Sequence, residues 1–214
     1  VLPYSEYAYG MLHGARLAAK LGLKRISVIE FGVAGGNGLL AAEAHALKIE
    51  KELDIHIEIF GFDTGGGLPP PVDWRDMPYM FAAGNYCMDA DRLRERLTRA
   101  KLVLGDVKET CKSFLADYSP PPIAFVSFDL DYYSSTTHAL DMFRSDADDY
   151  FLPRIFLHFD DVIGNEIALY NEFTGELAAI HDFNQSQPDC KIAENRTFRN
   201  YDISQPWYHQ SYIM

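Results

Sequence analysis

The sequence alternates short, continuously apolar runs with longer amphipathic stretches, and this alternation most restricts the possible fold. The apolar runs lack the polar–apolar pattern of a half-exposed strand, so we expect strands that are buried on both faces. Strands of this kind, separated by helices, favour a doubly wound α/β sheet whose strands are mostly parallel. The expected strands cover residues 26–33, 55–62, 102–104, 123–128 and 155–159.

The amphipathic stretches between these runs predict helices, the first of which is ended by Gly22. The last part of the chain, residues 191–214, alternates more and is expected to add antiparallel strands at one edge. Residues 64–89 are rich in Gly and Pro and form a connection longer than usual. Such loops often act as lids or binding loops. The expected helices cover residues 7–21, 38–53, 90–100, 109–118, 136–147 and 166–180.

Length, charge and cysteine content restrict the class of protein. The 214 residues suit a single domain, 1–214, with a substantial core. The formal net charge of −12 argues against nucleic-acid and anionic-membrane partners. The three cysteines have no CxxC spacing, so we expect reduced thiols and a cytoplasmic location. No apolar run approaches the roughly 20 residues of a membrane span. Because the chain begins at Val1 and not at a methionine, the sequence leaves open whether a leader has been removed.

An acidic residue stands at the carboxyl end of each expected strand. In doubly wound sheets ligands bind at these ends, so the acids are candidates for a common site. Helix capping can explain any one of them but explains the Asp129/Asp131 and Asp160/Asp161 pairs poorly. Converging carboxylates repel unless a cation or protons intervene, and oxygen ligands favour a hard cation such as Mg²⁺. The five strand-end acids are Glu30, Asp63, Asp106, Asp129 and Asp160.

The stretch VIEFGVAGGNG, residues 28–38, places a Gly-rich turn between a strand and a helix. The dinucleotide pattern GxGxxG fails from Gly32, and a nominal GxGxxA match begins at Gly36, several residues after the strand. The turn is therefore either structural or a ligand-binding turn. Asp63 is likewise either a ribose ligand or a turn cap, and Asp106 either contacts an adenine or caps the next helix.

Five motifs together resemble a known group of enzymes. They are EFGVAGGNG, GFDTGGGLP, LVLGDVKET, FDLDYYSST and HFDDVIGNEIALYNEF, and they run from about residue 26 to residue 173. The chain resembles a class I S-adenosylmethionine-dependent methyltransferase and, more narrowly, the macrocin O-methyltransferase family. The resemblance implies a seven-stranded, Rossmann-like sheet with an antiparallel C-terminal edge. It also implies methyl transfer to a hydroxyl of a small molecule, such as a sugar or natural product.

The resemblance also implies roles for individual residues. Glu30, Gly32 and Gly36 would surround the methionine part of S-adenosylmethionine, Asp63 would hold the ribose, and Asp106 the adenine region. The ligands of Mg²⁺, or of another hard divalent cation, would be Asp129, Asp160 and Asp161. Asp131 would be the general base. Residues 64–89 are expected to form a lid over the acceptor. The sequence leaves open whether the protein forms homo-oligomers.

Three alternatives remain at the level of the sequence. The DxD of FDLDYY with the later Asp-Asp resembles a metal-dependent phosphatase or phosphotransferase. The nominal match at Gly36 would suit a nicotinamide-dependent dehydrogenase. A non-catalytic module that binds a nucleoside or forms oligomers is the third.

Overall fold

The structure is a computed structural model that describes residues 4–144, 148–164, 166–201 and 205–214. The strands in these ranges are β1 (Arg25–Phe31), β2 (His56–Asp63), β3 (Lys101–Leu104), β4 (Ile123–Phe128), β5 (Phe151–Phe159), β6 (Ala193–Glu194) and β7 (Ser211–Ile213). The α-helices are α1 (Ser5–Lys20), α2 (Asn37–Leu53), α3 (Ala90–Arg96), α4 (Val107–Tyr118), α5 (Tyr133–Asp141) and α6 (Gly175–Ser186).

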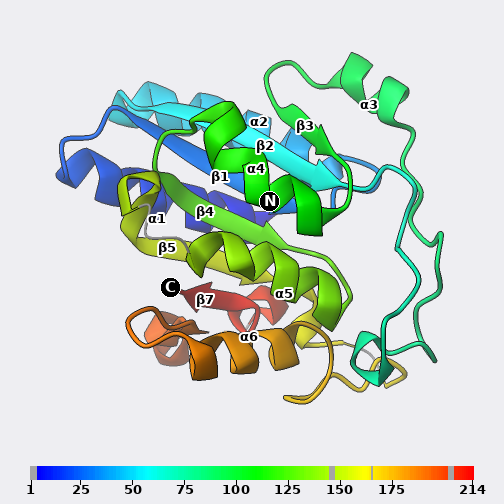
Figure 1. Cartoon of the computed structure of the whole chain (residues 1–214). Helices are drawn as coiled ribbons and strands as arrows, with labels where there is room; N and C mark the ends of the chain where they lie inside the picture. Colours follow the sequence, from blue (N-terminus) through cyan, green and yellow to red (C-terminus); the bar gives the residue numbers. More distant parts are fainter. Residues whose placement is uncertain (1–3, 145–147, 165, 202–204) are drawn as a thin grey trace.

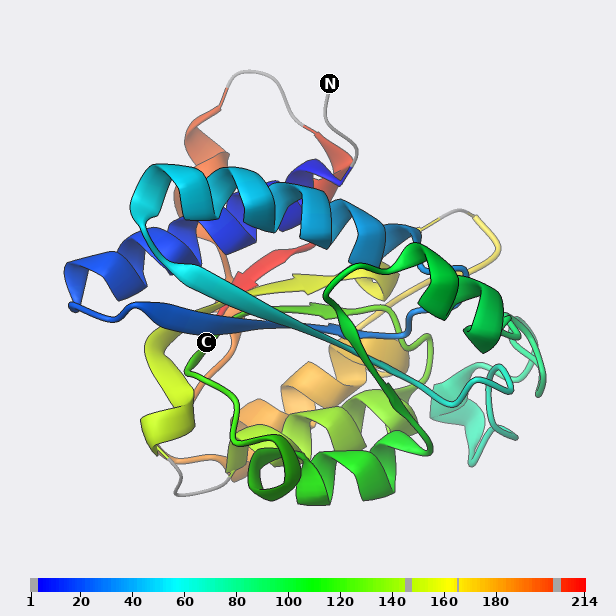
Figure 2. The same ribbon diagram turned by 90° about the horizontal axis from the view of Figure 1, so that it is seen from above.

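All strands of the described residues belong to one seven-stranded sheet with the order β3-β2-β1-β4-β5-β7-β6 (Figure 1). The pairs from β3 to β5 are parallel, whereas β7 is antiparallel to β5 and to β6. Helices α1 and α2 cover one face, and α4, α5 and α6 cover the other (Figure 2). The predicted doubly wound, mostly parallel sheet with an antiparallel C-terminal edge is therefore confirmed.

The chain order reverses between β1 and β4, and this is the point at which doubly wound sheets bind ligands. Gly32 follows β1 with a φ of 82°, and a Cβ there would lie 1.8 Å from the backbone oxygen of Asp129. Only glycine can therefore bring the ends of β1 and β4 this close together.

Three phenylalanines lie side by side beneath the ends of the central strands. The ring centroids of Phe31 and Phe128 are 5.2 Å apart, and those of Phe128 and Phe159 are 4.5 Å apart. All three rings are fully buried, and each burial stabilises the fold by roughly 1.5–3 kcal/mol. Phe128 and Phe159 directly precede Asp129 and Asp160. The packing of these rings therefore fixes the backbone positions from which the two acidic side chains extend.

Three predicted helices have bounds that differ from the structure by several residues, and one of them also extends outside the described residues. Residues 166–180 were expected to be one helix, but α6 begins only at Gly175. Leu169 has a left-handed φ of 53°, and the side chain of Asn171 accepts a hydrogen bond from the backbone of Phe173. Both features compete with helix formation. Helix α3 ends at Arg96 rather than at residue 100. The helix predicted at residues 136–147 corresponds to α5, which begins at Tyr133 and ends at Asp141 before a 3₁₀ turn at Met142–Arg144, and residues 145–147 lie outside the described part.

No helix among the described residues is both long enough and apolar enough to cross a lipid bilayer.

Candidate functional site

A cavity of about 310 Å³ opens at the carboxyl ends of the parallel strands. Its wall contains residues from the ends of β1 to β5 and from the segment after β2. Glu30 and Gly36 are not part of this wall. Seven of the nine predicted site residues line it: Gly32, Asp63, Asp106, Asp129, Asp131, Asp160 and Asp161. The fold therefore brings most of the predicted donor and cation residues into one cavity.

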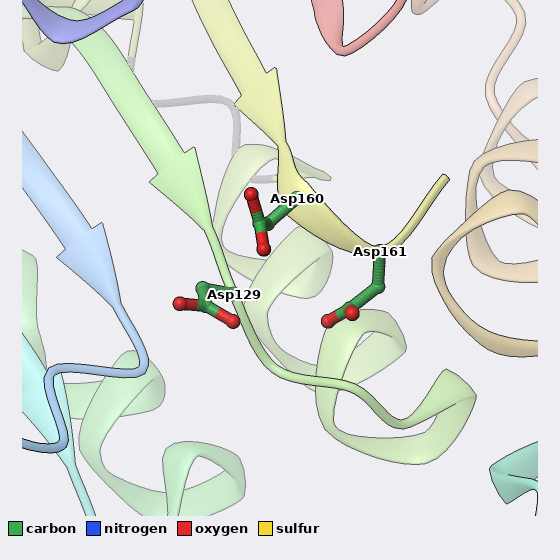
Figure 3. A group of neighbouring side chains, drawn as sticks. All are labelled: Asp129, Asp160 and Asp161. Carbon is green, nitrogen blue, oxygen red and sulfur yellow. The ribbon is translucent and has the colours of Figure 1, made fainter. Parts of the chain in front are cut away.

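Three of these acids converge on one point. Asp129, Asp160 and Asp161 each offer a carboxylate oxygen, and these oxygens lie within 4.8 Å of one another (Figure 3). Asp129 and Asp160 are solvent-exposed, whereas Asp161 is buried. Their spacing is close enough for one cation to contact all three carboxylates.

A bend in the chain lets two successive residues point into the same space. Strand β5 ends at Phe159, and residues Asp160–Val162 form a single 3₁₀ turn. In a continuing strand, neighbouring side chains would point to opposite faces. The turn instead directs Asp160 and Asp161 toward Asp129 (Figure 3).

The electrostatics of this cluster are unfavourable without a counter-charge. Although solvent reaches Asp129, the protein around its carboxylate partly desolvates it and raises its pKa well above the usual range, and the charges of Asp161 and Asp160 raise it further. Burial also raises the pKa of Asp161 to about 6. Among the described residues, no ion pair joins a lysine or an arginine to these acids, and His158 Nε2 lies 3.5 Å from Asp160 Oδ1. A hard divalent cation fits this all-carboxylate set and would relieve the repulsion.

Asp131 lies beside this cluster in an unusual backbone conformation. Its φ of 58° is left-handed, and its backbone N–H donates a hydrogen bond of 2.9 Å to Asp161 Oδ2. Burial raises the pKa of Asp131 to about 8, and the charges of Asp161 and Asp160 contribute. The side chain lines the cavity, so a carboxylate with raised proton affinity faces the space between the strand ends.

Asp63 organises the turn that follows β1. Its Oδ2 accepts hydrogen bonds from the backbone N–H groups of Val33 at 3.0 Å and Ala34 at 2.9 Å. Its Oδ1 accepts one from Gly65 at 2.7 Å. A carboxylate has about four acceptor sites, so these three bonds leave about one, and Asp63 is part of the cavity wall. Turn cap and ligand-binding residue are therefore compatible roles for Asp63.

Asp106 is the N-cap of α4, where its Oδ1 accepts a hydrogen bond from Lys108 N at 2.8 Å. It also lines the cavity together with Gly105 and Val107. Capping, one of the two interpretations from the sequence, therefore holds, and a contact between Asp106 and a ligand stays a prediction.

Glu30 and Gly36 lie elsewhere. Glu30 is buried, and its Oε1 accepts a hydrogen bond of 2.6 Å from the hydroxyl of Tyr7 on α1. Burial raises the pKa of Glu30 to about 8. A Cβ at Gly36 would lie 2.1 Å from the side chain of Leu93 on α3. In this structure both residues therefore make internal contacts beside the cavity.

Three residues that support the acids were not predicted from the sequence. The hydroxyl of Tyr170 donates a hydrogen bond of 2.6 Å to Asp161 Oδ1. The side-chain amide of Gln210 donates to the backbone oxygen of Asp160 at 2.8 Å and to its Oδ1 at 3.0 Å. Glu176 accepts hydrogen bonds from the backbone on both sides of the cluster. Only Tyr170 belongs to one of the five motifs.

The segment after β2 is anchored at its middle. Met77 and Phe81 are buried against Tyr132. The buried carboxylate of Asp76 accepts hydrogen bonds from Val72 N and from both the backbone and the hydroxyl of Ser134. Figure 1 shows this segment along the side of the molecule where the parallel strands end. Its two arms therefore border the cavity while its centre packs on the domain.

Comparison with solved structures identifies similar folds. A crystal structure of CalS11, described as a calicheamicin methyltransferase, has a TM-score of 0.64 and 21% identity, over 97% of this chain and 77% of that one. An apo structure described as CalS11, TDP-rhamnose 3′-O-methyltransferase, has a TM-score of 0.55 and 20% identity over 97% and 77% of the two chains. The O-methyltransferase NovP has a TM-score of 0.57 and 14% identity over 97% and 78%.

No protein-family model matches the sequence, and a search of the curated proteins finds no match. The likeness is thus one of structure rather than of close sequence. It confirms, at the level of the fold, the resemblance seen in the motifs. This chain has the Rossmann-like fold of the class I methyltransferases.

Proposed function

We propose that this protein is an O-methyltransferase that uses S-adenosylmethionine and a hard divalent cation such as Mg²⁺. The observation that carries the proposal is a single cavity lined by Asp63 and Asp106 on one side and by the acidic cluster on the other. The cavity lies at the strand ends, where this fold binds ligands. A donor and an acceptor bound there would meet at Asp129 and Asp131.

The donor would bind along the ends of β1, β2 and β3. The free acceptor site of Asp63 is suited to a ribose hydroxyl, because the three backbone hydrogen bonds already hold its carboxylate in place. Gly32 and Asp106 line the same cavity. There Gly32 would leave space for the methionine part, and Asp106 would accept a hydrogen bond from an adenine amine. Glu30 and Gly36 would not contact the donor. They would support the wall of the donor site through their contacts with Tyr7 and Leu93.

The residues that would hold the cation are Asp129, Asp160 and Asp161. When bound, a divalent cation lowers the pKa of a coordinated hydroxyl and so eases its deprotonation. Burial and mutual repulsion raise the pKa values of Asp129 and Asp161, and a bound cation would oppose both effects by favouring the ionised carboxylates.

Asp131 would accept the proton of the acceptor hydroxyl. The acceptor oxygen then forms a bond to the methyl carbon, the bond from that carbon to sulfur breaks, and its electron pair remains on sulfur. The products are the methyl ether and S-adenosylhomocysteine. The cavity would contribute mainly by holding oxygen, carbon and sulfur in line.

The acceptor would be a small molecule that carries a hydroxyl, with a sugar or natural product as the family-level choice. Of the similar structures, one is described as a TDP-rhamnose 3′-O-methyltransferase and another as an O-methyltransferase. Residues 64–89 would close over the acceptor, because Leu68, Pro69 and Tyr86 of this segment line the cavity.

The alternatives are less well supported. In a dehydrogenase, the second glycine of the match would let the backbone approach the dinucleotide. In the match that begins at Gly36 this glycine is Gly38, and a Cβ there would instead lie 1.8 Å from the buried Glu30 Oε1. In phosphatases of the DxD type the motif normally ends the first strand, whereas Asp129 and Asp131 follow β4. Both observations favour the methyltransferase.

Calorimetry tests the proposal directly. S-adenosylhomocysteine, NAD and a phosphate analogue are each titrated into the protein with and without Mg²⁺. We expect binding of S-adenosylhomocysteine alone among the three. Binding of NAD would favour the dehydrogenase over the methyltransferase. Binding of the phosphate analogue that requires Mg²⁺ would favour the metal-dependent phosphatase or phosphotransferase.

A further inference from the structure

We infer that Glu176, assisted by Tyr170, is a positioning residue that sets the geometry of the acidic cluster. The inference rests on the proposed cation site. Glu176 lies in the first turn of α6 and is fully buried. It belongs to neither strand end, so it acts from outside the segments that carry the acids.

The carboxylate of Glu176 joins the two strand ends. Its Oε2 accepts a hydrogen bond of 3.0 Å from the backbone N–H of Asp161, and its Oε1 accepts one of 3.3 Å from that of Leu130. Leu130 lies between Asp129 and Asp131, so one bond restrains the backbone of both. A single side chain therefore links the segment after β4 to the segment after β5.

Further hydrogen bonds complete this arrangement around Asp161. Its Oδ2 accepts from the backbone N–H of Asp131, and its Oδ1 accepts from the hydroxyl of Tyr170. The backbone and both carboxylate oxygens of Asp161 are thus held by groups from three different segments. Substitution of groups that orient cation ligands in this way commonly costs about 10- to 100-fold in metal affinity.

The burial of an acidic side chain at position 176 argues for a role at the site. A buried carboxylate beside other carboxylates opposes folding, through desolvation and through repulsion. An apolar residue at this position would avoid both penalties, although it would leave the two N–H groups unpaired. Burial and the charge of Asp161 raise the pKa of Glu176 well above its usual range, so the role of Glu176 follows from its two acceptor oxygens and not from its charge. An acid in this place is understandable if the backbone of the cluster must be held in one conformation.

The test compares two glutamates that hold backbone groups in the same way. Glu176→Gln retains the size of the side chain but presents an N–H₂ group to one of the two backbone donors. Glu43→Gln is the matched control, because Glu43 is also buried and accepts from the backbone N–H groups of Thr98, Arg99 and Ala100 far from the acids. Binding of Mn²⁺ alone is measured by electron paramagnetic resonance, and binding of S-adenosylhomocysteine by calorimetry.

We expect Glu176→Gln to weaken Mn²⁺ binding about 10- to 100-fold while affinity for S-adenosylhomocysteine stays near that of the wild type. Glu43→Gln should leave both affinities unchanged even if it lowers the melting temperature. If the wild type binds Mn²⁺ and Glu176→Gln binds it equally well, the positioning role alone is wrong. If the wild type does not bind Mn²⁺, the cation site itself fails and this inference with it.

Tyr170→Phe provides a second variant in case Glu176→Gln does not fold. It removes only the hydrogen bond to Asp161 Oδ1, and the residue is half-buried, so the fold should tolerate it. A several-fold loss of Mn²⁺ affinity supports the arrangement. Wild-type affinity in Tyr170→Phe, with Glu176→Gln unfolded, overturns it.

Discussion

Individual acids at the strand ends differ in role because their surroundings differ. Asp129, Asp160 and Asp161 direct oxygens to one point, whereas Asp131 has a left-handed backbone and lies beside them. Glu30 makes an internal hydrogen bond instead. Each residue can therefore be tested by a substitution that changes charge and keeps size.

Asp131 and Asp160 form a matched pair for separating proton transfer from cation binding. Asp131→Asn should retain cation binding and lower turnover by about 10²–10⁴-fold, the usual contribution of a general base. Asp160→Asn should abolish cation-stimulated turnover and leave S-adenosylhomocysteine affinity nearly intact. Steady-state kinetics with Mg²⁺ titration measures both. Loss of cation binding in Asp131→Asn would make Asp131 a ligand rather than the base.

Asp63 provides the test of the donor half. Asp63→Ala should weaken binding of S-adenosylhomocysteine by about 1–3 kcal/mol, because polar partners lose their acceptor. Calorimetry measures this change. Asp89→Ala is the control, since Asp89 accepts from Arg92 N at the start of α3 and does not line the cavity. Equal affinity in wild type and Asp63→Ala would remove Asp63 from the ribose role.

The raised pKa of Glu30 leads us to expect that the stability of the protein depends on pH. Burial raises its pKa from 4.5 to about 8 in the folded protein, so between these values the unfolded chain releases a proton that the folded chain keeps. The free energy of unfolding should therefore fall as the pH rises through this window, by up to about 1.4 kcal/mol per pH unit. Glu30→Gln should reduce this fall.

Urea unfolding at pH 5 and at pH 8 measures the effect. Glu43→Gln is again the control, because the pKa of Glu43 is lowered and its carboxylate stays ionised across this window. It should keep the pH dependence of the wild type. The same dependence in Glu30→Gln would mean that Glu30 is ionised in the folded protein.

At the scale of elements, the segment from residue 64 to residue 89 consists of two arms around an anchored centre. Met77 and Phe81 are buried, whereas Trp74, Tyr79 and Tyr86 are exposed. Of these three, Tyr86 also lines the cavity, and an exposed aromatic side chain there suits contact with an acceptor. The proposed lid movement should therefore be confined to the arms.

Hydrogen exchange can resolve this pattern. We expect fast exchange in residues 64–72 and 82–89 and slower exchange around Met77 and Phe81, because burial protects the centre. Addition of S-adenosylhomocysteine and an acceptor should slow exchange in the arms, whereas α2 provides an internal reference that should not change. Full protection of the arms without ligand would contradict the lid.

For the whole molecule, the cation would connect the ends of β4 and β5 and so stabilise the folded state. A ligand at about 100 times its dissociation constant adds roughly 2.7 kcal/mol to the free energy of unfolding. We expect Mg²⁺ to raise the melting temperature, and EDTA to reverse this and to stop methyl transfer. Asp160→Asn should show no such rise. Methyl transfer at full rate in EDTA would show that the reaction needs no cation.

Much of this protein follows from its sequence because the signals are local. The apolar run at residues 123–128 predicted a strand with the observed bounds. Glycines and acids at the strand ends predicted the position of the cavity. The helix expected at residues 166–180 was wrong in its first half, because an Asn171 side-chain turn competes with the helical pattern there.

Only the tertiary structure decided which distant groups hold the acids. Glu176 lies 46 positions from Leu130 and Gln210 lies 50 positions from Asp160, so no local pattern connects them. The structure likewise placed Glu30 against Tyr7 rather than in the cavity wall. Strand ends are determined by short-range periodicity, whereas the direction and support of each carboxylate depend on segments that only the packing of α1, α6 and the C-terminal strands brings together.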